Sequence, residues 1–373
     1  MILSLCTFSV LMYNNDTKCN RTIDPGGCIQ WISTDNPDLN SKFIEELQKL
    51  LTCPTPSNSH HGLEILDDHF YGHQDLKILQ KAIGSGGFSS VYIAYWKNTS
   101  VKYAIKKFKE TSKEEEINNE IKIMKIASHH PNIIRFYGIT KLQYENKYSL
   151  VLEHAEHGTL RDYLRKNAIT FRWNEQLKFA KEISSAILWL HDDREIVHRD
   201  LHPNNVLIHQ NTIKLADFGR SSLKGTKGTD CYNTDEVWGI MPYVDPKALN
   251  RNIPYKINEK SDIYNLGFLF WELTSRKPPF DDLENDHITC KILSGKREEP
   301  VLDTNVKFIE LYQKCWKHEP DERPNISQVN SELNSIDSKN NNASIVPYER
   351  EESKKTKFVH SCQIDLNKIY QQN

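Results

Sequence analysis

One short loop carries residues whose types and spacing suit phosphate chemistry: positions 198–205 read HRDLHPNN. Asp200 is followed five residues later by Asn205, and Asp217 opens an Asp-Phe-Gly triplet after the apolar segment 213–216. An aspartate can act as a base toward a hydroxyl, while an asparagine and a second aspartate offer oxygen ligands to Mg²⁺. Phosphoryl transfer from ATP needs this set, because the protein must place a nucleophile and neutralise phosphate charge.

The composition of the 373-residue chain narrows its partners. Lysine and arginine total 48 against 50 acidic residues, so the net charge of −2 gives no electrostatic reason to expect nucleic acid or an anionic membrane. The longest apolar stretch, 2–13, is shorter than the roughly 20 residues that span a bilayer and lacks the flanks of a signal peptide. The eight cysteines form no Cys-x-x-Cys pair, which favours reduced thiols in a cytoplasmic protein.

The chain divides into three zones. Residues 1–73 are polar, with one predicted short helix at 41–51 that we interpret as a packing helix rather than a partner-binding one. Strand-like runs then occupy 78–83, 91–95, 103–108 and 148–153, and longer helical stretches follow, such as 173–190 and 261–274. Strands first and helices later predict an α+β domain over 74–336, with a small sheet-rich lobe (74–155) joined to a larger helical lobe (156–336). Residues 337–373 are predicted to be a poorly ordered polar tail.

A glycine-rich segment near the start of the dense zone is the candidate phosphate cradle. Gly84, Gly86 and Gly87 lie between two predicted strands, where glycines let backbone amides approach phosphates. Alone, such a loop is a weak signal. Lys106 ends a later strand-like run, and Glu120 is the carboxylate expected to fix it, since the acids at 114–116 suit a solvated first helical turn.

The order of these residues resembles that of a eukaryotic protein kinase domain. The collinear set is Gly84, Gly86, Val91, Lys106, Glu120, Asp200, Asn205 and Asp217. Further landmarks of the family are Asp262, Cys315-Trp316 and Arg323-Pro324. The best local match is the tyrosine-kinase-like division, and the phrases at 243–246 and 296–300 are similar to its large fungal expansions.

The resemblance implies a bilobal kinase fold, ATP and Mg²⁺ as cofactors, and a protein substrate. Lys106, fixed by Glu120, would hold the α- and β-phosphates, and Asp200 would take up the acceptor proton. Asn205 and Asp217 would hold Mg²⁺. The nucleotide pocket would be lined by Ile83, Gly84, Gly86, Gly87, Val91, Ala104, Lys106, Leu152, Glu153, Ala155 and Leu207, with the backbone of Glu153 and Ala155 at the adenine edge.

The resemblance also implies how the catalytic loop is supported and how the activity is regulated. Asp262 would hold the catalytic loop, and a regulatory spine would stack Met124, Phe136, His198 and Phe218. In kinases that have an arginine at the position of Arg199, a phosphate on the activation loop supplies its counter-charge and orders the loop. An upstream kinase or autophosphorylation would add this phosphate. The candidate acceptors in that loop are Ser221, Ser222, Thr226, Thr229, Tyr232 and Thr234, with Thr229 and Thr234 first.

Two coupled departures from the family pattern concern the acceptor. His202 stands where serine/threonine kinases usually have a lysine that stabilises the γ-phosphoryl, and Ile240 replaces the threonine that touches this lysine. Tyrosine kinases also lack this lysine, so these departures leave the acceptor hydroxyl open; the prediction is a Ser/Thr hydroxyl, with Tyr as an alternative. We hypothesise that a protonated His202 replaces part of the charge, so that activity falls as pH rises through its pKa; otherwise His202 simply packs against the loop.

A third departure concerns the anchor of the activation loop. Lys247 replaces the glutamate that normally pairs with a buried arginine, here Arg323. Arg323 is therefore expected to find another acid, such as Asp321 or Glu322, or to leave the loop more loosely anchored.

The sequence predicts an ATP-dependent protein kinase in signal transduction, with two alternatives. The departures at 202, 240 and 247 mildly favour a pseudokinase scaffold that binds ATP and acts through protein contacts, but the intact Lys106, Asp200, Asn205 and Asp217 argue against it. In the other alternative, residues 1–73 are the main interaction module and the kinase regulates them, although no motif supports this.

Overall fold

The computed structural model describes residues 70–337 apart from 98, 144, 226–238 and 250–254, together with the backbone of three strands between residues 10 and 32. These strands belong to a unit of their own, residues 1–63. β1 (Val10–Asn14), β2 (Thr17–Ile23) and β3 (Ile29–Ile32) form an antiparallel sheet in that order. The sequence reading did not predict this sheet, and its predicted helix at 41–51 lies outside the described residues.

The second unit begins with a six-stranded sheet of order β4-β8-β9-β7-β6-β5. Its strands are β4 (Phe70–Tyr71), β5 (Leu76–Ser85), β6 (Ser89–Trp96), β7 (Lys102–Phe108), β8 (Phe136–Lys141) and β9 (Tyr148–Glu153). The four predicted strands are confirmed as β5, β6, β7 and β9, whereas β8 was not predicted. All pairings are antiparallel except that of the short β4 with β8.

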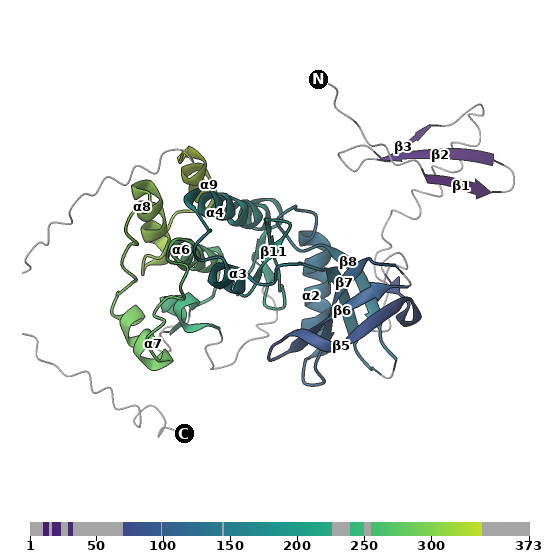
Figure 1. Cartoon of the computed structure of the whole chain (residues 1–373), viewed down its shortest axis with the longest axis horizontal. Coiled ribbons are helices and arrows are strands. Elements are labelled where there is room, and N and C mark those ends of the chain that lie inside the picture. The colour runs from purple at the N-terminus through teal and green to yellow at the C-terminus, as the bar shows by residue number, and fades with distance from the viewer. Residues whose placement is uncertain are drawn as a thin grey trace, which may run out of the picture. The chain divides into compact units, whose positions relative to one another are not determined.

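One long helix, α2 (Glu114–Ala127), packs with this sheet (Figure 1). Three glutamates occupy its first turn and Lys125 its last, which suits the helix dipole. Ile117, Ile121 and Met124 recur at helical spacing and are buried. The apolar stripe therefore faces the core and fixes which side of α2 turns toward the sheet.

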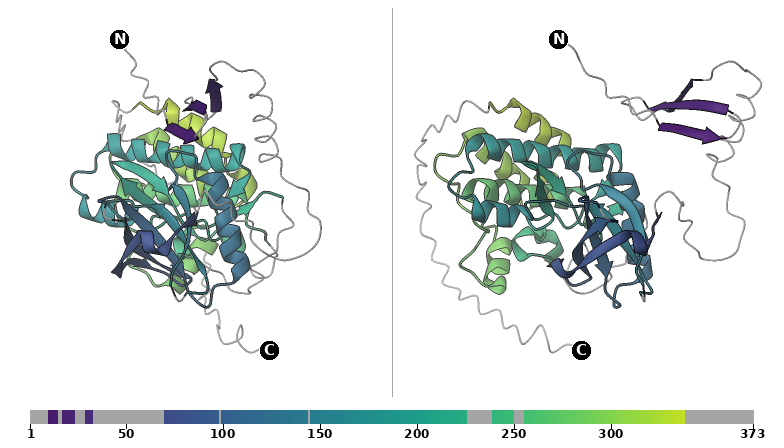
Figure 2. Two further views of the ribbon diagram at one scale, coloured as in Figure 1. Left: turned by 90° about the vertical axis from the view of Figure 1, so that its right-hand side faces the viewer. Right: turned by 45° about the vertical axis from the view of Figure 1, so that its right-hand side comes forward.

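The rest of the unit is mainly helical and forms a second lobe (Figures 1 and 2). Its helices are α3 (Leu160–Lys166), α4 (Trp173–Leu188), α5 (Pro246–Leu249), α6 (Glu259–Ser275), α7 (Asn285–Leu293), α8 (Val306–Cys315) and α9 (Ile326–Ser335). Its short strands are β10 (Ile196–Val197), β11 (Val206–His209), β12 (Thr212–Leu215) and β13 (Ser222–Leu223). The predicted α+β order of strands before helices is confirmed.

Helix α6 is the centre of the helical lobe, because every residue from Ser261 to Thr274 is buried. A helix that is buried all round must be packed closely by its neighbours. Gly267 permits this: a Cβ there would lie 2.8 Å from the Trp316 Cβ and 3.0 Å from the Tyr312 carbonyl oxygen. The absence of a side chain lets α6 and α8 approach at this point.

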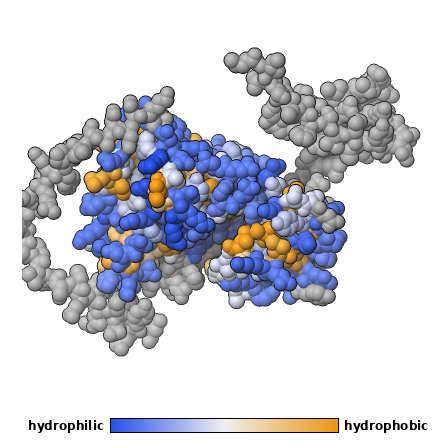
Figure 3. Space-filling view, in the orientation of Figure 1, coloured by the Kyte–Doolittle hydropathy of each residue, from blue (hydrophilic) through white to orange (hydrophobic). Residues whose placement is uncertain are grey.

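Large apolar side chains are exposed on both lobes: Phe70, Leu79, Ile83, Phe88 and Val101 on the sheet-rich lobe, and Ile169, Leu293 and Leu302 on the helical lobe. An apolar patch on the sheet-rich lobe is visible in Figure 3, while most of the surrounding face is hydrophilic. No helix in the described part of the chain is both long and apolar enough to cross a membrane.

Candidate active site

Lys106 lies at the centre of an ion-pair network that joins the sheet to α2 and to segment 217–219. Its Nζ is 2.5 Å from Glu120 Oε1 and 2.9 Å from Asp217 Oδ1. Lys106 and Glu120 are both buried. The neighbouring Lys107 pairs instead with Glu145, as expected when successive strand residues point to opposite faces. The structure thus brings three predicted site residues together.

Lys106 and Asp217 stabilise each other's charge, whereas burial raises the pKa of Glu120 despite the opposing charge of Lys106. Burial acts to lower the pKa of Lys106, but Asp217 and Glu120 outweigh burial and raise it above its ordinary value. Desolvation likewise acts to raise the pKa of Asp217, but the Lys106 ammonium lowers it to about 2. Lys106 and Asp217 are therefore both charged at neutral pH, which is the form needed to hold phosphate and a cation.

The glycine-rich segment forms the turn between β5 and β6. Gly84 pairs with Val91 across the two strands, and the Gly86 N–H donates to the Ser89 carbonyl at 2.9 Å. A Cβ on Gly84 or Gly87 would meet nothing within 4 Å. The space beside this turn is open, and Val91 lies opposite Lys106 in the next pair of strands, so the predicted cradle and its lysine are neighbours.

The predicted adenine end of the site lies where β9 leaves the sheet. Ala104 is buried and pairs with Leu152 across β7 and β9. The Glu153 side chain accepts a hydrogen bond from the Arg135 N–H at 3.1 Å and binds Lys214 Nζ at 3.0 Å. This ion pair ties β9 to β12 in the other lobe. Sequence reasoning assigned only the backbone of Glu153 and missed Lys214.

Asp200 and Asn205 are joined directly. Asn205 Nδ2 donates to the Asp200 carbonyl oxygen at 2.8 Å and lies 3.4 Å from Asp200 Oδ2. With its amide nitrogen committed to Asp200, Asn205 keeps Oδ1 for a ligand. The Asp217 side chain is 47% exposed, so its carboxylate is accessible from the same site. An amide oxygen and a carboxylate fit Mg²⁺, which takes oxygen ligands and shares them with phosphates.

Asp262 at the start of α6 supports this loop from beneath. It accepts the His198 N–H on Oδ2 and the Arg199 N–H on Oδ1, each at 2.8 Å. Oδ2 also lies 2.8 Å from His191 Nε2. Arg199 has a φ of 67°, a conformation that costs about 1–3 kcal/mol and persists only where neighbouring groups hold it. The hydrogen bonds that the His198 and Arg199 N–H groups donate to Asp262 hold it here, in line with the predicted supporting role.

The segment after Asp217 is fastened to both lobes. The His198 and Phe218 rings lie 5.0 Å apart and are fully buried, with Met124 and Phe136 also in the core. Asn119 Nδ2 on α2 donates to the Ser221 carbonyl at 2.9 Å. Helix α2 therefore sits where Glu120 reaches Lys106, with the Asp-Phe-Gly triplet closed against it.

The comparisons with known proteins match this geometry. The model of the family described as protein tyrosine and serine/threonine kinase matches residues 77–333, more than half of the chain. The chain belongs to the protein kinase family. It is 34% identical over 68% of its length to a Dictyostelium discoideum protein named as a probable serine/threonine-protein kinase. It is 30% identical over 67% of its length to mitogen-activated protein kinase kinase kinase 7 of Drosophila melanogaster, and 30% over 78% to the mouse tyrosine-protein kinase ABL2. These matches span 15%, 36% and 24% of the respective relatives.

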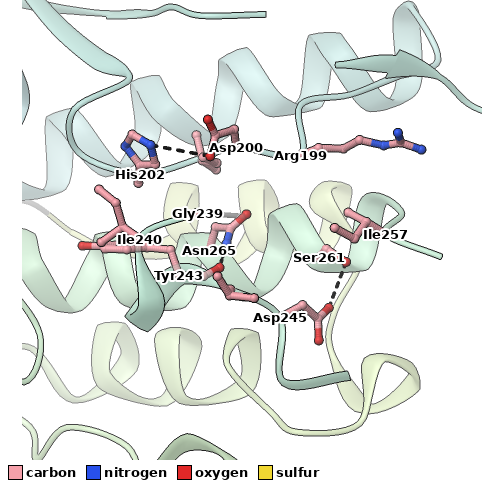
Figure 4. A pocket seen from close by; sticks show the side chains of 12 residues that line it. Arg199, Asp200, His202, Gly239, Ile240, Tyr243, Asp245, Ile257, Ser261 and Asn265 are labelled. Carbon is pink, nitrogen blue, oxygen red and sulfur yellow. Dashed lines mark hydrogen bonds and ion pairs between the residues drawn. The ribbon is translucent and has the colours of Figure 1, made fainter. Parts of the chain in front are cut away.

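In this kinase domain His202 belongs to the catalytic loop and faces segment 239–245. Its Nε2 is 3.6 Å from Asp200 Oδ1 and 3.3 Å from Asn205 Nδ2. Figure 4 shows His202 beside Ile240 in the pocket that both line. Burial lowers the pKa of His202, although Asp200 opposes this. The lowered pKa works against the hypothesis of a protonated His202, because the neutral ring is favoured.

The anchor of the activation segment differs from the expectation for Arg323. Arg323 binds neither Asp321 nor Glu322 but Asp245, at the end of segment 239–245. Lys247 turns outward to Glu319 at 2.6 Å. Of the two alternatives, the structure shows the one in which Arg323 finds another acid, but neither of the two acids named. The acid two residues before Lys247 lies within reach of the guanidinium and forms a buried pair with it.

Most of the predicted phosphorylation positions in this kinase lie outside the described residues: Thr226, Thr229, Tyr232 and Thr234. Ser221 is described and is buried, with Oγ donating to the His198 carbonyl at 3.1 Å. Ser221 therefore serves the packing of the loop. Ser222 is partly buried on β13.

Sequence reasoning also missed two cations of the helical lobe. Arg220 follows the Asp-Phe-Gly triplet, and its Nη1 lies 3.8 Å from Asp200 Oδ1. Arg161 on α3 reaches Glu272 of α6 at 3.2 Å, and Tyr243 donates to the same carboxylate. Arg220 could have been predicted to lie near the site, because it directly follows the Asp-Phe-Gly triplet. Nothing in the sequence around Arg161 indicates its contact with Glu272.

Proposed function

We propose that this chain is an active protein kinase that transfers the γ-phosphoryl of ATP to Ser or Thr hydroxyls of proteins, with Tyr as an alternative acceptor. The observation that carries the proposal is the assembled Lys106–Glu120–Asp217 network beside Asp200. In kinases both the lysine–glutamate pair and the triplet aspartate must be in place for catalysis. A pseudokinase is not favoured, because the chain keeps Lys106, Glu120, Asp200 and Asp217.

The proposed reaction divides its work among these residues. Lys106 binds phosphate oxygens, and Glu120 prevents it from leaving the site. Asp200 orients the acceptor hydroxyl and takes its proton as the new P–O bond forms; the bond between the γ-phosphorus and the bridging oxygen breaks, and ADP leaves. Asn205 and Asp217 would hold Mg²⁺, which neutralises phosphate charge when bound. Asp262 keeps the backbone of 198–200 still during transfer.

The finer assignments rest on separate supports. Two of the three relatives described above carry serine/threonine or kinase-kinase-kinase names and one a tyrosine kinase name, so the acceptor is proposed from the family and the relatives' names. Regulation by phosphate on the activation loop rests on Arg199 next to Asp200. A cytoplasmic location is proposed from the cysteines: the sequence has no Cys-x-x-Cys pair, and Cys290 and Cys315, the two within the described residues, are free thiols.

The test is labelling of the chain and of an added acceptor protein with Mg²⁺ and γ-labelled ATP. Wild type is compared with Asp200→Asn, which keeps the shape of the side chain and removes the base. We expect labelling by wild type only, on Ser and Thr by phosphoamino-acid analysis. Equal labelling by both proteins would reject the enzyme, and labelling confined to Tyr would reject the Ser/Thr assignment.

A further inference from the structure

The two oxygens of the catalytic aspartate face different groups. Asp200 Oδ2 faces the amide nitrogen of Asn205 at 3.4 Å. Oδ1 faces His202 Nε2 at 3.6 Å and Arg220 Nη1 at 3.8 Å. One oxygen therefore belongs to the metal side of the site, and the other is shared by the residue at position 202 and by an arginine that follows the Asp-Phe-Gly triplet.

Position 202 is where serine/threonine kinases usually place a lysine, and this chain has lost both that lysine and its threonine partner, now Ile240. His202 Nε2 lies 3.3 Å from Asn205 Nδ2, so the ring packs against the metal side of the loop. An imidazole does not carry the permanent positive charge that a lysine would bring to this position. Phosphoryl transfer still requires positive charge around the γ-phosphoryl oxygens.

Arg220 is placed to provide it. Its side chain is 20% exposed and that of Asp200 is 21% exposed, and the two lie 3.8 Å apart, so solvent and ligands reach both groups. A base must lie within hydrogen-bond reach of the hydroxyl that it deprotonates, which puts Arg220 within one side-chain length of the acceptor. A guanidinium keeps its charge at any working pH and presents several donors to a phosphoryl group.

We propose that Arg220 supplies, on the acceptor side of the site, the positive charge that serine/threonine kinases usually draw from a lysine at position 202. The proposal rests on the kinase activity proposed above. Arg220 contacts the base and lies beside the transferring group, so its effect falls on the chemical step rather than on ATP binding. His202 and Arg220 face the same Asp200 oxygen, so a lysine introduced at 202 can take over the charge.

The experiment measures kcat, the KM for ATP and the equilibrium affinity for ATP in the full chain, with Mg²⁺-ATP and casein as a Ser/Thr acceptor. The variants are Arg220→Gln, Arg220→Lys and Arg220→Gln combined with His202→Lys. Arg165→Gln, which removes an exposed arginine from α3, is the matched control. We expect Arg220→Gln to lower kcat about 100- to 1,000-fold, with ATP affinity within about twofold of wild type. Arg220→Lys should keep most of kcat, and His202→Lys should restore at least a fifth of the lost activity.

The outcomes separate this proposal from the kinase activity itself. If wild type labels casein no more than Asp200→Asn, the proposed activity fails. If wild type is active and Arg220→Gln has the kcat of wild type or a higher one, Arg220 supplies no charge to the reaction. If the loss of kcat in Arg220→Gln comes with a loss of ATP affinity and of thermal stability, and His202→Lys does not restore kcat, the proposal is overturned in favour of a structural role for Arg220.

Discussion

Arg323 binds Asp245 through two hydrogen bonds, Nη1 to Oδ2 at 2.7 Å and Nη2 to Oδ1 at 3.0 Å, and solvent reaches neither side chain. Ser261 Oγ donates to the same carboxylate at 2.8 Å. The cluster joins the end of the activation segment to the start of α6 and to the loop before α9. A kinase that lacks the usual glutamate at position 247 thus keeps a buried anchor two residues earlier.

Removal of Asp245 should therefore destabilise the domain strongly. Asp245→Ala leaves the Arg323 guanidinium buried without its carboxylate, which costs about 3–5 kcal/mol of unfolding free energy. Lys247→Ala removes only a partly exposed ion pair with Glu319 and should cost less than about 1 kcal/mol. Denaturant unfolding of both variants measures the difference. Similar losses in the two variants would show that the buried pair is not the anchor.

Because Asp262 supports the catalytic loop, we expect the replacement of one of its carboxylate oxygens by an amide nitrogen to lower activity. Asp262→Asn places an amide nitrogen against the His198 or Arg199 N–H, because each carboxylate oxygen accepts one of them. The shifted loop should lower kcat about 10- to 100-fold, with a smaller change in ATP affinity. The matched control is Asp192→Asn. Asp192 is the exposed aspartate next to His191 in the sequence, and it accepts a hydrogen bond from Ser327 Oγ at 2.6 Å. Equal kcat values in the two variants would contradict the supporting role.

Features that could be predicted from the sequence are those with a local pattern. Strands such as β6 and β7 have β-branched and aromatic runs, and α4 and α6 have apolar residues at helical spacing. Lys106, Glu120 and Asp217 could be named from the sequence because they follow the order of motifs of a known family, so that no distance between them had to be known. The Lys106–Glu120 pair is what this order predicts, and the two side chains lie 2.5 Å apart in the structure. The contact of Lys106 with Asp217 was not predicted.

Features that the sequence did not predict depend on contacts between distant residues. His191 and Asp262 are 71 residues apart and Arg323 and Asp245 are 78 apart, so no spacing rule connects either pair. The choice of Asp245 over Asp321 or Glu322 is a matter of direction: 320–322 form a 3₁₀ turn beside Arg323, and the guanidinium points instead toward α6. Only the folded chain shows which acid it meets.

The glycine of the Asp-Phe-Gly triplet should be needed for the ion pair and not for folding. A Cβ on Gly219 would lie 3.2 Å from Glu120 Oε2 and 3.4 Å from Asp217 Oδ1, so Gly219→Ala should push Glu120 away from Lys106. We expect kcat to fall about tenfold with the thermal midpoint within about 2 °C of wild type. A double-mutant cycle with Glu120→Ala tests the route: additive effects would mean that Gly219 does not act through Glu120.

The buried Glu272 predicts a pH dependence of stability. Burial raises the pKa of Glu272 to about 7, despite the opposing charge of Arg161. A carboxyl whose folded pKa exceeds its unfolded value gives its full stability at pH values below about 4.5, and this stability is lost as pH rises to about 7. Glu272→Gln does not titrate. From pH 4.5 to 7.5 the unfolding free energy of wild type should therefore fall by about 3 kcal/mol relative to the variant. Denaturant unfolding of both proteins at several pH values measures this difference, and parallel curves across the whole range would show that folding does not raise the pKa of Glu272.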